Sequence, residues 1–257
     1  MTRVMDLNSD LGEAFGAHQV GFDDELFDLI SSANVACGWH GGDPRVMERT
    51  IRICRDKGIA VGAHPGFADL VGFGRREIKI TPDEARTDTL YQTAALDGFC
   101  RAAGVRMHHV KAHGAFYNAA VRNRELADGV AAGVKSFDPT LIMLAQPGTQ
   151  LFAASVAAGL PTAREGFIDR GYNPDGTLVA RGTPGALITD PSEASERVLR
   201  LLEEGLLRTA DGSDLAIEVD SLCIHSDTPG AVAVLTRVRA DLERAGVTIA
   251  TFGRGQG

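Results

Sequence analysis

The stretch IAVGAHPGFADLVGFGRR, residues 59–76, decides the fold expected for this chain. It opens with a short apolar run that stops at His64, and Pro65 and Gly66 follow at once. Proline and glycine end a strand, so the pattern predicts a buried strand that presents an imidazole at its carboxyl end. The glycine-rich loop beyond it carries three charged side chains, Asp69, Arg75 and Arg76. A histidine at a strand end, ahead of such a loop, indicates a functional site.

Apolar runs of this kind recur along the chain and alternate with helical patterns. The expected strands are 4–7, 34–37, 59–64, 107–111, 141–144, 162–164 and 222–224, with a last apolar run at 247–251. Helix start signals lie between them, at 43–44, 81–84 and 190–193. Alternation predicts a parallel sheet, because two parallel strands need a crossover that is usually helical. We therefore expect an α/β fold in the form of a closed, TIM-like (β/α) barrel.

The composition is that of one α/β domain spanning 1–257. The chain has 257 residues, of which 44% are hydrophobic and only 6% aromatic, and it contains 30 glycines. Such a composition suits aliphatic strands joined by many tight turns, and no linker-like segment divides the chain. The formal net charge of -8 argues against nucleic acid or an anionic membrane as a partner, because both need a basic surface.

The cysteines and the N-terminal segment point to a cytoplasmic protein. Four cysteines are far apart and form no CxxC pair, which argues against a zinc ribbon or a disulfide scaffold and favours reduced thiols. The segment MTRVMDLNSD reaches Asp6 and Asp10 before an apolar leader can form. No apolar run of about 18 residues follows, so we expect no membrane span.

Chemically active side chains fall at the carboxyl ends of the expected strands, where parallel barrels carry their chemistry. These side chains are Asp10, His40, His64, His113, Glu165 and His225. Because successive strand ends meet in a barrel, we expect them to share one pocket. Imidazoles beside carboxylates bind a divalent metal, bind an anionic substrate or exchange protons, and the sequence leaves these alternatives open. If a metal is bound, the predicted ligands are Asp10, His64 and His113.

Basic residues near the same strand ends predict an anion site. Lys111 shares a strand face with His109 and His113, because the three are spaced by two. Guanidinium groups offer two parallel donors for a carboxylate or phosphate, and the candidates are Arg75, Arg76, Arg170 and Arg181. The segment GVAAGVKS at 129–136 lacks the adjacent Gly-Lys pair of a P-loop. If ATP is used, it is therefore expected at a different kind of site or on a partner chain.

Other reactive side chains are interpreted as structural. Cys37 follows an apolar run and is interpreted as a small buried residue rather than a nucleophile. His18, His108 and His109 do not lie at an expected strand end, and we interpret them as structural.

Six segments spread over nearly the whole chain form a signature. They are DLNSDLGE at 6–13, NVACGWHGGDP at 34–44, GAHPGFADLVGFGRR at 62–76, VKAHGAFYN at 110–118, REGFIDRGY at 164–172 and CIHSDTPGA at 223–231. Together and in this order they resemble the LamB/YcsF family, whose members include a subunit of bacterial ATP-dependent 5-oxoprolinase. The chain departs from the usual pattern at Trp39, Ala112 and Ser226, where phenylalanine, proline and glycine are common. These changes affect the fine shape of the pocket and remove no polar group.

The resemblance implies a seven-stranded barrel related to the glycoside hydrolase/deacetylase-like fold. It also implies a role in opening the lactam of 5-oxo-L-proline to L-glutamate, with ATP as co-substrate. Two further 5-oxoprolinase subunits are the implied partners.

Site roles follow from the strand ends together with the resemblance. The predicted catalytic residues are Asp10, His40, His64, Lys111, His113, Glu165 and His225. The predicted substrate-binding residues are Asn8, Arg75, Arg76, Asp169, Arg170 and Asp227. In this hypothesis Asp10 or a neighbouring histidine acts as base, while Lys111 and the arginines stabilise the charge of a transferred phosphate.

Two other functions stay open at this point. The first is a metal-dependent deacetylase or amidohydrolase that acts alone, without ATP. The second is a non-catalytic subunit that binds the substrate for its partners.

Overall fold

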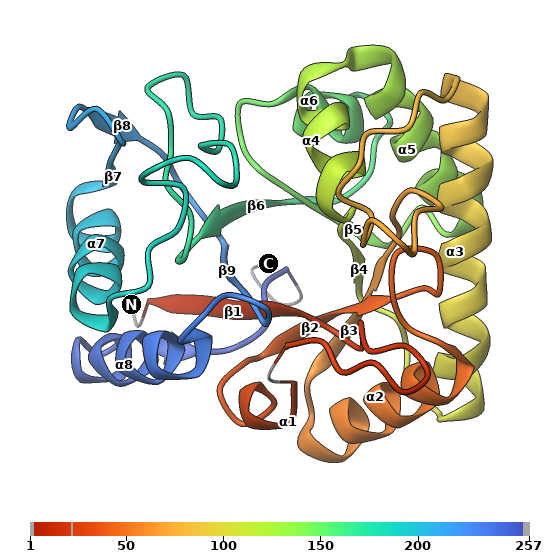
Figure 1. Ribbon diagram of the computed structural model, residues 1–257, viewed down its shortest axis with the longest axis horizontal. Helices are drawn as coiled ribbons and strands as arrows, with labels where there is room; N and C mark the ends of the chain where they lie inside the picture. The colour runs from red at the N-terminus through yellow and green to blue at the C-terminus, as the bar shows by residue number, and fades with distance from the viewer. Residues whose placement is uncertain (1–2, 22, 254–257) are drawn as a thin grey trace.

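In the computed structural model, which describes residues 3–21 and 23–253, seven parallel strands close into a barrel (Figure 1). In order around the barrel they are β1 (Val4–Leu11), β2 (Ser32–Ala36), β3 (Ala60–His64), β4 (His109–Val110), β5 (Ile142–Ala145), β6 (Thr162–Phe167) and β9 (Ser221–His225). Strand β9 pairs with both β6 and β1, which closes the ring. The short strand β10 (Thr248–Ile249) pairs with the start of β1. The expected seven-stranded α/β barrel is confirmed.

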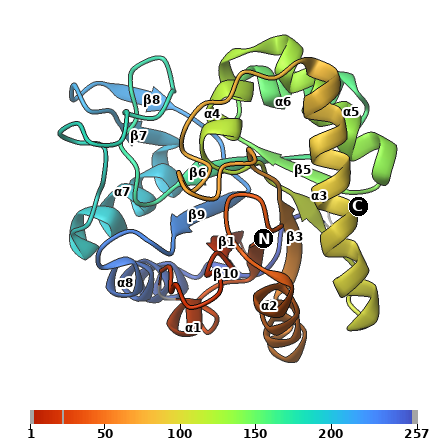
Figure 2. The ribbon, with the colours of Figure 1, turned by 45° about the vertical axis from the view of Figure 1, so that its right-hand side comes forward.

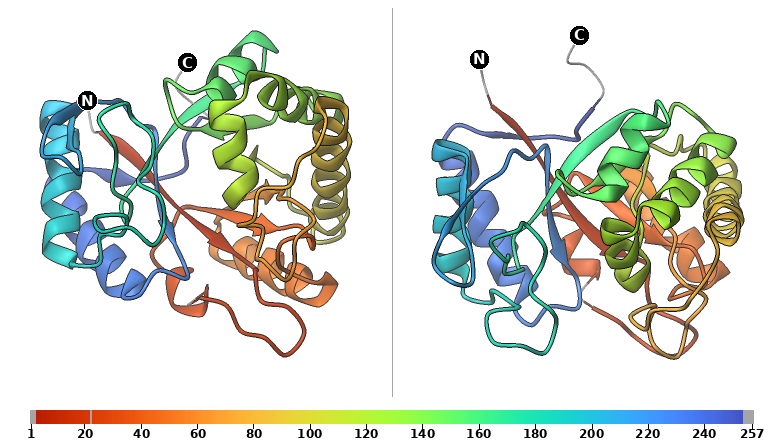
Figure 3. Two further views of the ribbon diagram at one scale, coloured as in Figure 1. Left: turned by 45° about the horizontal axis from the view of Figure 1, so that its top comes forward. Right: turned by 90° about the horizontal axis from the view of Figure 1, so that it is seen from above.

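Helices surround this barrel on the outside (Figure 2). They are α1 (Asp23–Leu26), α2 (Pro44–Lys57), α3 (Pro82–Ala102), α4 (Gly114–Arg122), α5 (Arg124–Phe137), α6 (Gln150–Ala157), α7 (Pro191–Glu204) and α8 (Ala231–Arg244). A hairpin of β7 (Leu206–Arg208) and β8 (Asp214–Ala216) stands apart from the barrel strands (Figure 3). Among the described residues, no helix combines the length and the apolar character needed to cross a membrane.

The predicted helix start signals act as caps. Asp43 accepts hydrogen bonds from the backbone of Arg45 and Val46 at the start of α2. Thr81 and Glu84 form a reciprocal capping box at the start of α3. Helix α2 ends at Gly58, whose φ of 70° lies in the left-handed region that glycine tolerates. These local signals explain why the helices begin and end where the sequence predicts.

Some elements differ from the sequence prediction. Strand β1 continues through Leu11, four residues beyond the expected end, so that Asn8 and Asp10 belong to the strand itself. Strand β4 is only two residues long. Two helices follow β4 in succession, and Asn123 separates them by capping α5 with its side chain. The hairpin strands β7 and β8 have three residues each, which is too short for an alternating pattern to be recognised.

The interior of the barrel is polar, whereas its outer face is apolar. Leu7 and Leu11 of β1 are buried in the apolar core of the molecule. The alternate residues Asp6, Asn8 and Asp10 are also buried, and each makes hydrogen bonds with side chains of other strands. Successive side chains of a strand point to opposite faces. The second face of β1 therefore carries a row of polar groups along the barrel axis.

Candidate functional site

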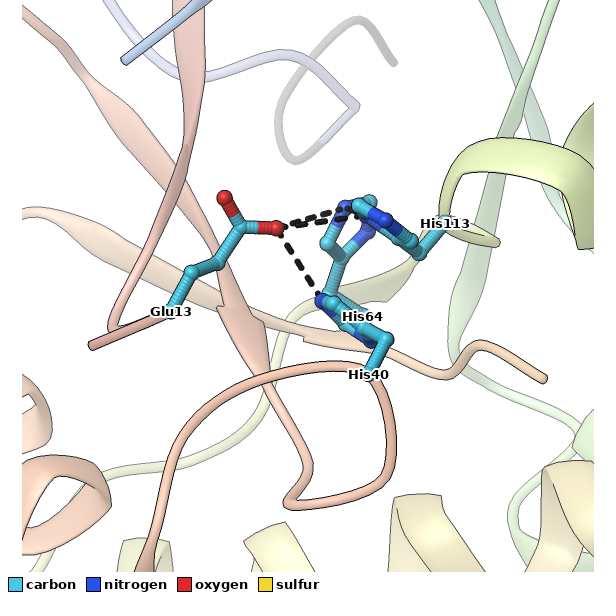
Figure 4. A group of neighbouring side chains, drawn as sticks. All are labelled: Glu13, His40, His64 and His113. Atoms are coloured by element: carbon cyan, nitrogen blue, oxygen red, sulfur yellow. Dashed lines mark hydrogen bonds and ion pairs between the residues drawn. The ribbon is translucent and has the colours of Figure 1, made fainter. Parts of the chain in front are cut away.

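Four buried side chains meet at the carboxyl end of the barrel (Figure 4). Glu13 follows β1, His40 lies between β2 and α2, His64 ends β3 and His113 directly precedes α4. The Oε1 atom of Glu13 lies 3.0 Å from Nε2 of His40, 3.2 Å from Nδ1 of His113 and 3.9 Å from Nε2 of His64. We call these four residues the histidine–glutamate cluster.

The glycine-rich loop of residues 65–76 folds directly over this cluster. A Cβ atom on Gly74 would lie 2.6 Å from Cβ of His40 and 2.7 Å from Cδ2 of His113, so a side chain at this position is excluded. The neighbouring Phe73 has a positive φ of 53°, which is uncommon for a residue with a side chain. Its carbonyl oxygen accepts a hydrogen bond from His113. The loop thus fixes the rings from outside the barrel.

Backbone carbonyls fix the tautomers of two of these histidines. Nδ1 of His64 lies 2.8 Å from the carbonyl oxygen of Lys111, and Nε2 of His113 lies 2.8 Å from that of Phe73. A carbonyl only accepts hydrogen bonds, so each of these nitrogens is the protonated one. In the neutral rings the lone pairs are then on Nε2 of His64 and Nδ1 of His113, which are 3.0 Å apart. Two lone pairs at this separation need a shared proton or a cation between them.

The cluster fits a divalent cation. One ligand atom from each of Glu13, His40, His64 and His113 lies within 4.8 Å of the others. Ligands of a tetrahedral site with bonds of about 2.1 Å are roughly 3.4 Å apart, close to the separations found here. Burial lowers the pKa of His40 to about 3. Despite burial, the hydrogen bonds of His113 and His40 hold the pKa of Glu13 far below its ordinary value. A neutral imidazole and an ionised carboxylate are the forms that bind metals.

Next to the cluster, Lys111 joins two buried carboxylates. Its Nζ lies 2.8 Å from Oδ1 of Asp10, 2.9 Å from Oε1 of Glu165 and 3.0 Å from Sγ of Cys223. Burial acts to lower the pKa of Lys111, but Asp10, Cys223 and Glu165 raise it well above its ordinary value. Burial likewise acts to raise the pKa of Asp10, but His64 and Lys111 hold it well below its usual range. Both groups are therefore charged.

One oxygen of Asp10 is left to face the histidines. Its Oδ2 atom lies 3.3 Å from Nε2 of His64 and 4.0 Å from Nε2 of His225. Because Asp10 lies on β1 between its register partners Asn34 and His225, it stands at the centre of the site. The second group of potential metal ligands, Asp10, Cys223 and His225, includes this same carboxylate.

His225 is oriented by a buried carboxylate. Its Nδ1 lies 3.1 and 3.0 Å from the two oxygens of Asp169, which also accepts a hydrogen bond from Thr228 at 2.5 Å. Despite burial, the charge and hydrogen bond of His225 lower the pKa of Asp169 to about 2. The ring of Phe167 stacks on His225 with centroids 5.7 Å apart. Nδ1 therefore donates to Asp169, and Nε2 faces Asp10.

A pocket of about 400 Å³ opens over these groups. Its lining includes three barrel residues and three arginines, namely Asp10, Lys111, His225, Arg75, Arg170 and Arg181. Burial and the nearby guanidinium of Arg181 lower the pKa of Arg170 to about 10, so this side chain still carries its charge at neutral pH. A wall with three guanidinium groups suits an anionic ligand.

The other residues predicted to bind substrate have varied positions. Asn8 is fully buried on β1, deeper in the barrel than Asp10. Arg75 lines the pocket and pairs with Asp227 at 2.6 Å. Arg76 pairs with Asp69, and its side chain is 66% exposed. Asp169, as described above, lies behind His225.

Sequence reasoning missed Glu13 as a member of the site. The available signal was the carboxylate-rich turn after the first strand, since a buried carboxylate needs a partner. The partners of Glu13 are His40, His64 and His113, which lie far along the chain. Of the three predicted metal ligands, His64 and His113 belong to the cluster, and Asp10 lies beside His64.

These features define the class of protein as a parallel seven-stranded (β/α) barrel with a buried histidine–carboxylate centre at the carboxyl ends of its strands. The model of the LamB/YcsF family matches residues 5–256. The chain belongs to the LamB/YcsF family, which confirms the resemblance found in the sequence.

Relatives match over nearly their full length. The chain is 49% identical over 251 residues to a 5-oxoprolinase subunit of Symbiobacterium thermophilum, and the match covers 98% of this chain and 96% of the relative. It is 48% identical over 249 residues to the corresponding 5-oxoprolinase subunit of Pyrococcus furiosus, covering 97% of this chain and 98% of the relative.

Solved structures confirm the fold. The crystal structure of a lactam utilization protein from Thermus thermophilus aligns with a TM-score of 0.92 and 48% identity, covering 97% of this chain and 100% of that one. The catalytic domain of a peptidoglycan N-acetylglucosamine deacetylase from Eubacterium rectale aligns with a TM-score of 0.54 at 10% identity, covering 99% and 90%. The second likeness is one of fold alone, and it agrees with the expected deacetylase-like barrel.

Proposed function

We propose that this chain is a subunit of an ATP-dependent 5-oxoprolinase, which opens the lactam of 5-oxo-L-proline to L-glutamate. The observation that carries the proposal is the identity of 48–49% over nearly the whole chain to proteins named as one particular 5-oxoprolinase subunit. The proposal includes two partner subunits and a cytoplasmic location. It also assigns the use of ATP to the assembled enzyme rather than to a nucleotide site on this chain.

The residues of the site suit the opening of a lactam. A lactam is a stable amide, and transfer of a phosphoryl group from ATP to its carbonyl oxygen makes the carbonyl carbon a better electrophile. Water then attacks this carbon, the C–N bond of the ring breaks and the nitrogen leaves as an amine, which gives γ-glutamyl phosphate. A second water cleaves this acyl phosphate to L-glutamate and inorganic phosphate. In this scheme Oδ2 of Asp10 accepts the proton of the water, because Lys111 keeps that carboxylate ionised.

The leaving nitrogen needs a proton, and His225 is placed to supply it. Asp169 holds Nδ1 of His225, so that Nε2 is the nitrogen available to exchange a proton on the side of Asp10. The arginines of the pocket wall bind the carboxylate of the substrate and the negative charge of its phosphate. Lys111 and Glu165 keep the charge of the interior balanced while the proton moves.

A divalent metal is part of the proposal. Glu13, His40, His64 and His113 would hold it, with Asp10 beside His64. When bound, it would supply Lewis acidity toward an oxygen of the substrate. Elemental analysis of protein purified without chelators is expected to find about one equivalent of a divalent ion. A preparation that is active and free of any stoichiometric ion would rule the metal out.

The decisive experiment is a coupled assay of glutamate release by the chain co-expressed with its partner subunits, with and without ATP. We expect glutamate only when 5-oxo-L-proline, ATP and all subunits are present. Asp10→Asn is expected to lower the rate by roughly 10²-fold or more, because it removes the proposed base. Asp128→Asn, an exposed carboxylate on α5 that pairs with Arg124, is the matched control and should leave the rate unchanged. Unchanged turnover in Asp10→Asn would exclude Asp10 as the base.

A second candidate function is an amidohydrolase that acts alone, and the histidine–glutamate cluster is the observation that favours it. Dependence on ATP discriminates the two, because a stand-alone amidohydrolase cleaves its substrate without nucleotide. The third, a subunit that binds substrate without catalysis, predicts binding of 5-oxo-L-proline by calorimetry together with full turnover in Asp10→Asn.

A further inference from the structure

A row of buried polar groups leads from the middle of the barrel to Asp10. Nδ2 of Asn34 lies 2.8 Å from Oδ1 of Asp10 and 2.8 Å from Oδ1 of Asn8. Oδ1 of Asn34 lies 2.8 Å from Nε2 of His109. The side chains of Asn8, Asn34 and His109 are completely buried. The polar hydrogens and lone pairs of these side chains therefore have to be satisfied by one another and by their buried neighbours.

These contacts fix the orientation of the Asn34 amide. Its two Nδ2 hydrogens are directed to two oxygen acceptors, on Asp10 and Asn8. Its Oδ1 therefore accepts from Nε2 of His109, which must carry the hydrogen. If the amide were turned by 180°, an amide oxygen would face the carboxylate of Asp10 and an NH₂ group would face the N–H of His109. Asp10 thus excludes the turned amide, and His109, with its hydrogen on Nε2, completes the remaining orientation.

The backbone of β3 makes room for the His109 ring. Gly62 is the register partner of His109, and a Cβ atom on Gly62 would lie 2.2 Å from Nε2 of His109. Only glycine at this position allows the imidazole to lie across the interior and reach Asn34. Burial keeps the pKa of His109 well below its ordinary value, so the ring is neutral and adds no positive charge beside Lys111.

The hydrogen bonds to Asp10 determine which of its carboxylate oxygens is free. Asn34 and Lys111 both donate to Oδ1, each at 2.8 Å. With Oδ1 held by two donors, one on β2 and one directly after β4, rotation of the carboxyl group is restricted. Oδ2 is then the oxygen that faces His64 and His225.

We propose that Asn34 and His109 are positioning residues, which through their hydrogen-bonded chain hold the Asp10 carboxylate with Oδ2 directed toward the histidines. This inference rests on the proposed function only in assigning Asp10 the role of catalytic base. Neither residue lies in the wall of the pocket, and both act through Asp10. His109 therefore has a functional role in addition to the structural one expected from its place in the sequence.

The test compares two substitutions of His109 in the complex with its partner subunits. His109→Leu removes the donor to Asn34, and kcat for glutamate release is expected to fall roughly 10²-fold with KM changed less than about twofold, as for a misplaced catalytic group. His109→Gln keeps an N–H donor and is expected to retain kcat within about fivefold. Asn34→Ala and Asn34→Ala with His109→Leu should have the same kcat, because they break the same chain.

The matched control is Ser32→Ala, which removes a buried hydroxyl from the same face of β2 that contacts Asp6 instead of Asp10. It should lower stability and leave kcat unchanged. Equal loss of kcat in His109→Leu, His109→Gln and Ser32→Ala would overturn the proposal, since it would indicate a general structural effect.

Crystal structures give a readout that does not depend on activity. In His109→Leu the Asp10 carboxyl group is expected to rotate away from its position in the parent protein, whereas in His109→Gln it should stay. An unmoved Asp10 in His109→Leu would overturn the proposal. If His109→Leu does not fold, Asn34→Ser serves as the second variant, because serine is too short to bridge Asp10, Asn8 and His109. If the parent complex releases no glutamate, the proposed function fails while the structures still decide the positioning role.

Discussion

Asp6 and Asp10 lie on the same face of β1, and both are buried, yet their pKa values are shifted in opposite directions. Asp6 is surrounded by the hydroxyls of Ser31, Ser32 and Ser221, and burial raises its pKa to about 6. Asp10 is close to His64 and to the ammonium group of Lys111, which together hold its pKa well below the usual range despite burial.

Burial alone does not make a reactive carboxylate in this barrel. Hydroxyl donors stabilise the carboxylate of Asp6 only in part, whereas an ammonium group at hydrogen-bond distance outweighs the cost of desolvation at Asp10. In the amino-terminal half of the barrel interior, burial therefore disfavours the charged form of Asp6. The carboxyl-terminal half holds charged groups in balance, as a catalytic site requires.

The largest effect is expected from Lys111→Met. Asp10 would lose its ammonium partner and would then resemble Asp6, a buried carboxyl group without a cation at hydrogen-bond distance. Two buried carboxylates, Asp10 and Glu165, would lose the cation between them. Removing one partner of a buried ion pair typically costs about 3–5 kcal/mol. We expect a loss of unfolding free energy of this size in chemical denaturation, together with loss of nearly all glutamate release.

Lys79→Met, which replaces an exposed lysine shortly after the glycine-rich loop, is the control and should change neither quantity. Glu165→Gln in the Lys111→Met background removes one of the two buried carboxyl groups that lose their cation and is expected to restore part of the stability. Normal stability of Lys111→Met would contradict the charge balance described here.

Asp169→Asn changes a third buried carboxylate, one that is hydrogen-bonded to a histidine. Asparagine keeps the shape but offers an NH₂ group or a neutral oxygen to Nδ1 of His225, so the tautomer of the ring is no longer fixed. We expect kcat to fall by roughly 10²-fold with little change in KM, because His225 would no longer exchange its proton correctly. The measurement is steady-state glutamate release. A change confined to KM would instead support the substrate-binding role predicted for Asp169 from the sequence.

A third test removes the charge of Asp6 by Asp6→Asn. The folded pKa of about 6 lies above the ordinary value of 3.8 for this side chain, so protonated Asp6 favours the folded state. Stability from this group is complete below about pH 4, is lost as the pH rises to about 6, and stays lost above it. The shift corresponds to about 3 kcal/mol at neutral pH, of which roughly 1 kcal/mol is offset by imperfect hydrogen bonds of the amide.

We therefore expect Asp6→Asn to be about 2 kcal/mol more stable than the parent at pH 7 and to lose this advantage between about pH 6 and pH 4. Denaturation curves measured at several pH values check the prediction. An advantage that is the same at pH 4 and pH 7 would show that the carboxylate of Asp6 is not the cause.

Local patterns were sufficient to predict the strands and the strand-end residues of this barrel. An apolar run that stops at a histidine is visible in the sequence at His64, and the parallel arrangement then brings it to His113 and to Asp10, which also faces His225. Capping residues such as Asp43 and Thr81 are equally local, and they act as predicted.

Contacts across the barrel were beyond the reach of sequence patterns. Glu13 lies in a turn, and its three histidine partners come from other strand ends. Asn34 and His109 are 75 positions apart, and only closure of the barrel directs both to Asp10. The spacing of His109 from Lys111 indicates a shared strand face, but it does not say which partner lies across that face.

The smallest effect is expected from Ser32→Ala, which removes one of the hydroxyl donors to Asp6. Ser32 donates a hydrogen bond of 2.8 Å to Oδ2 of Asp6, and this donor favours the ionised carboxylate. Its removal should raise the pKa of Asp6 further and cost about 1 kcal/mol above pH 6, where Asp6 is ionised. Below about pH 4 the cost should be smaller, because the carboxyl group is then protonated in the folded and unfolded states. Denaturation of the parent and Ser32→Ala at both pH values measures the difference, and a cost larger at low pH would contradict an ionised Asp6 held by serine hydroxyls.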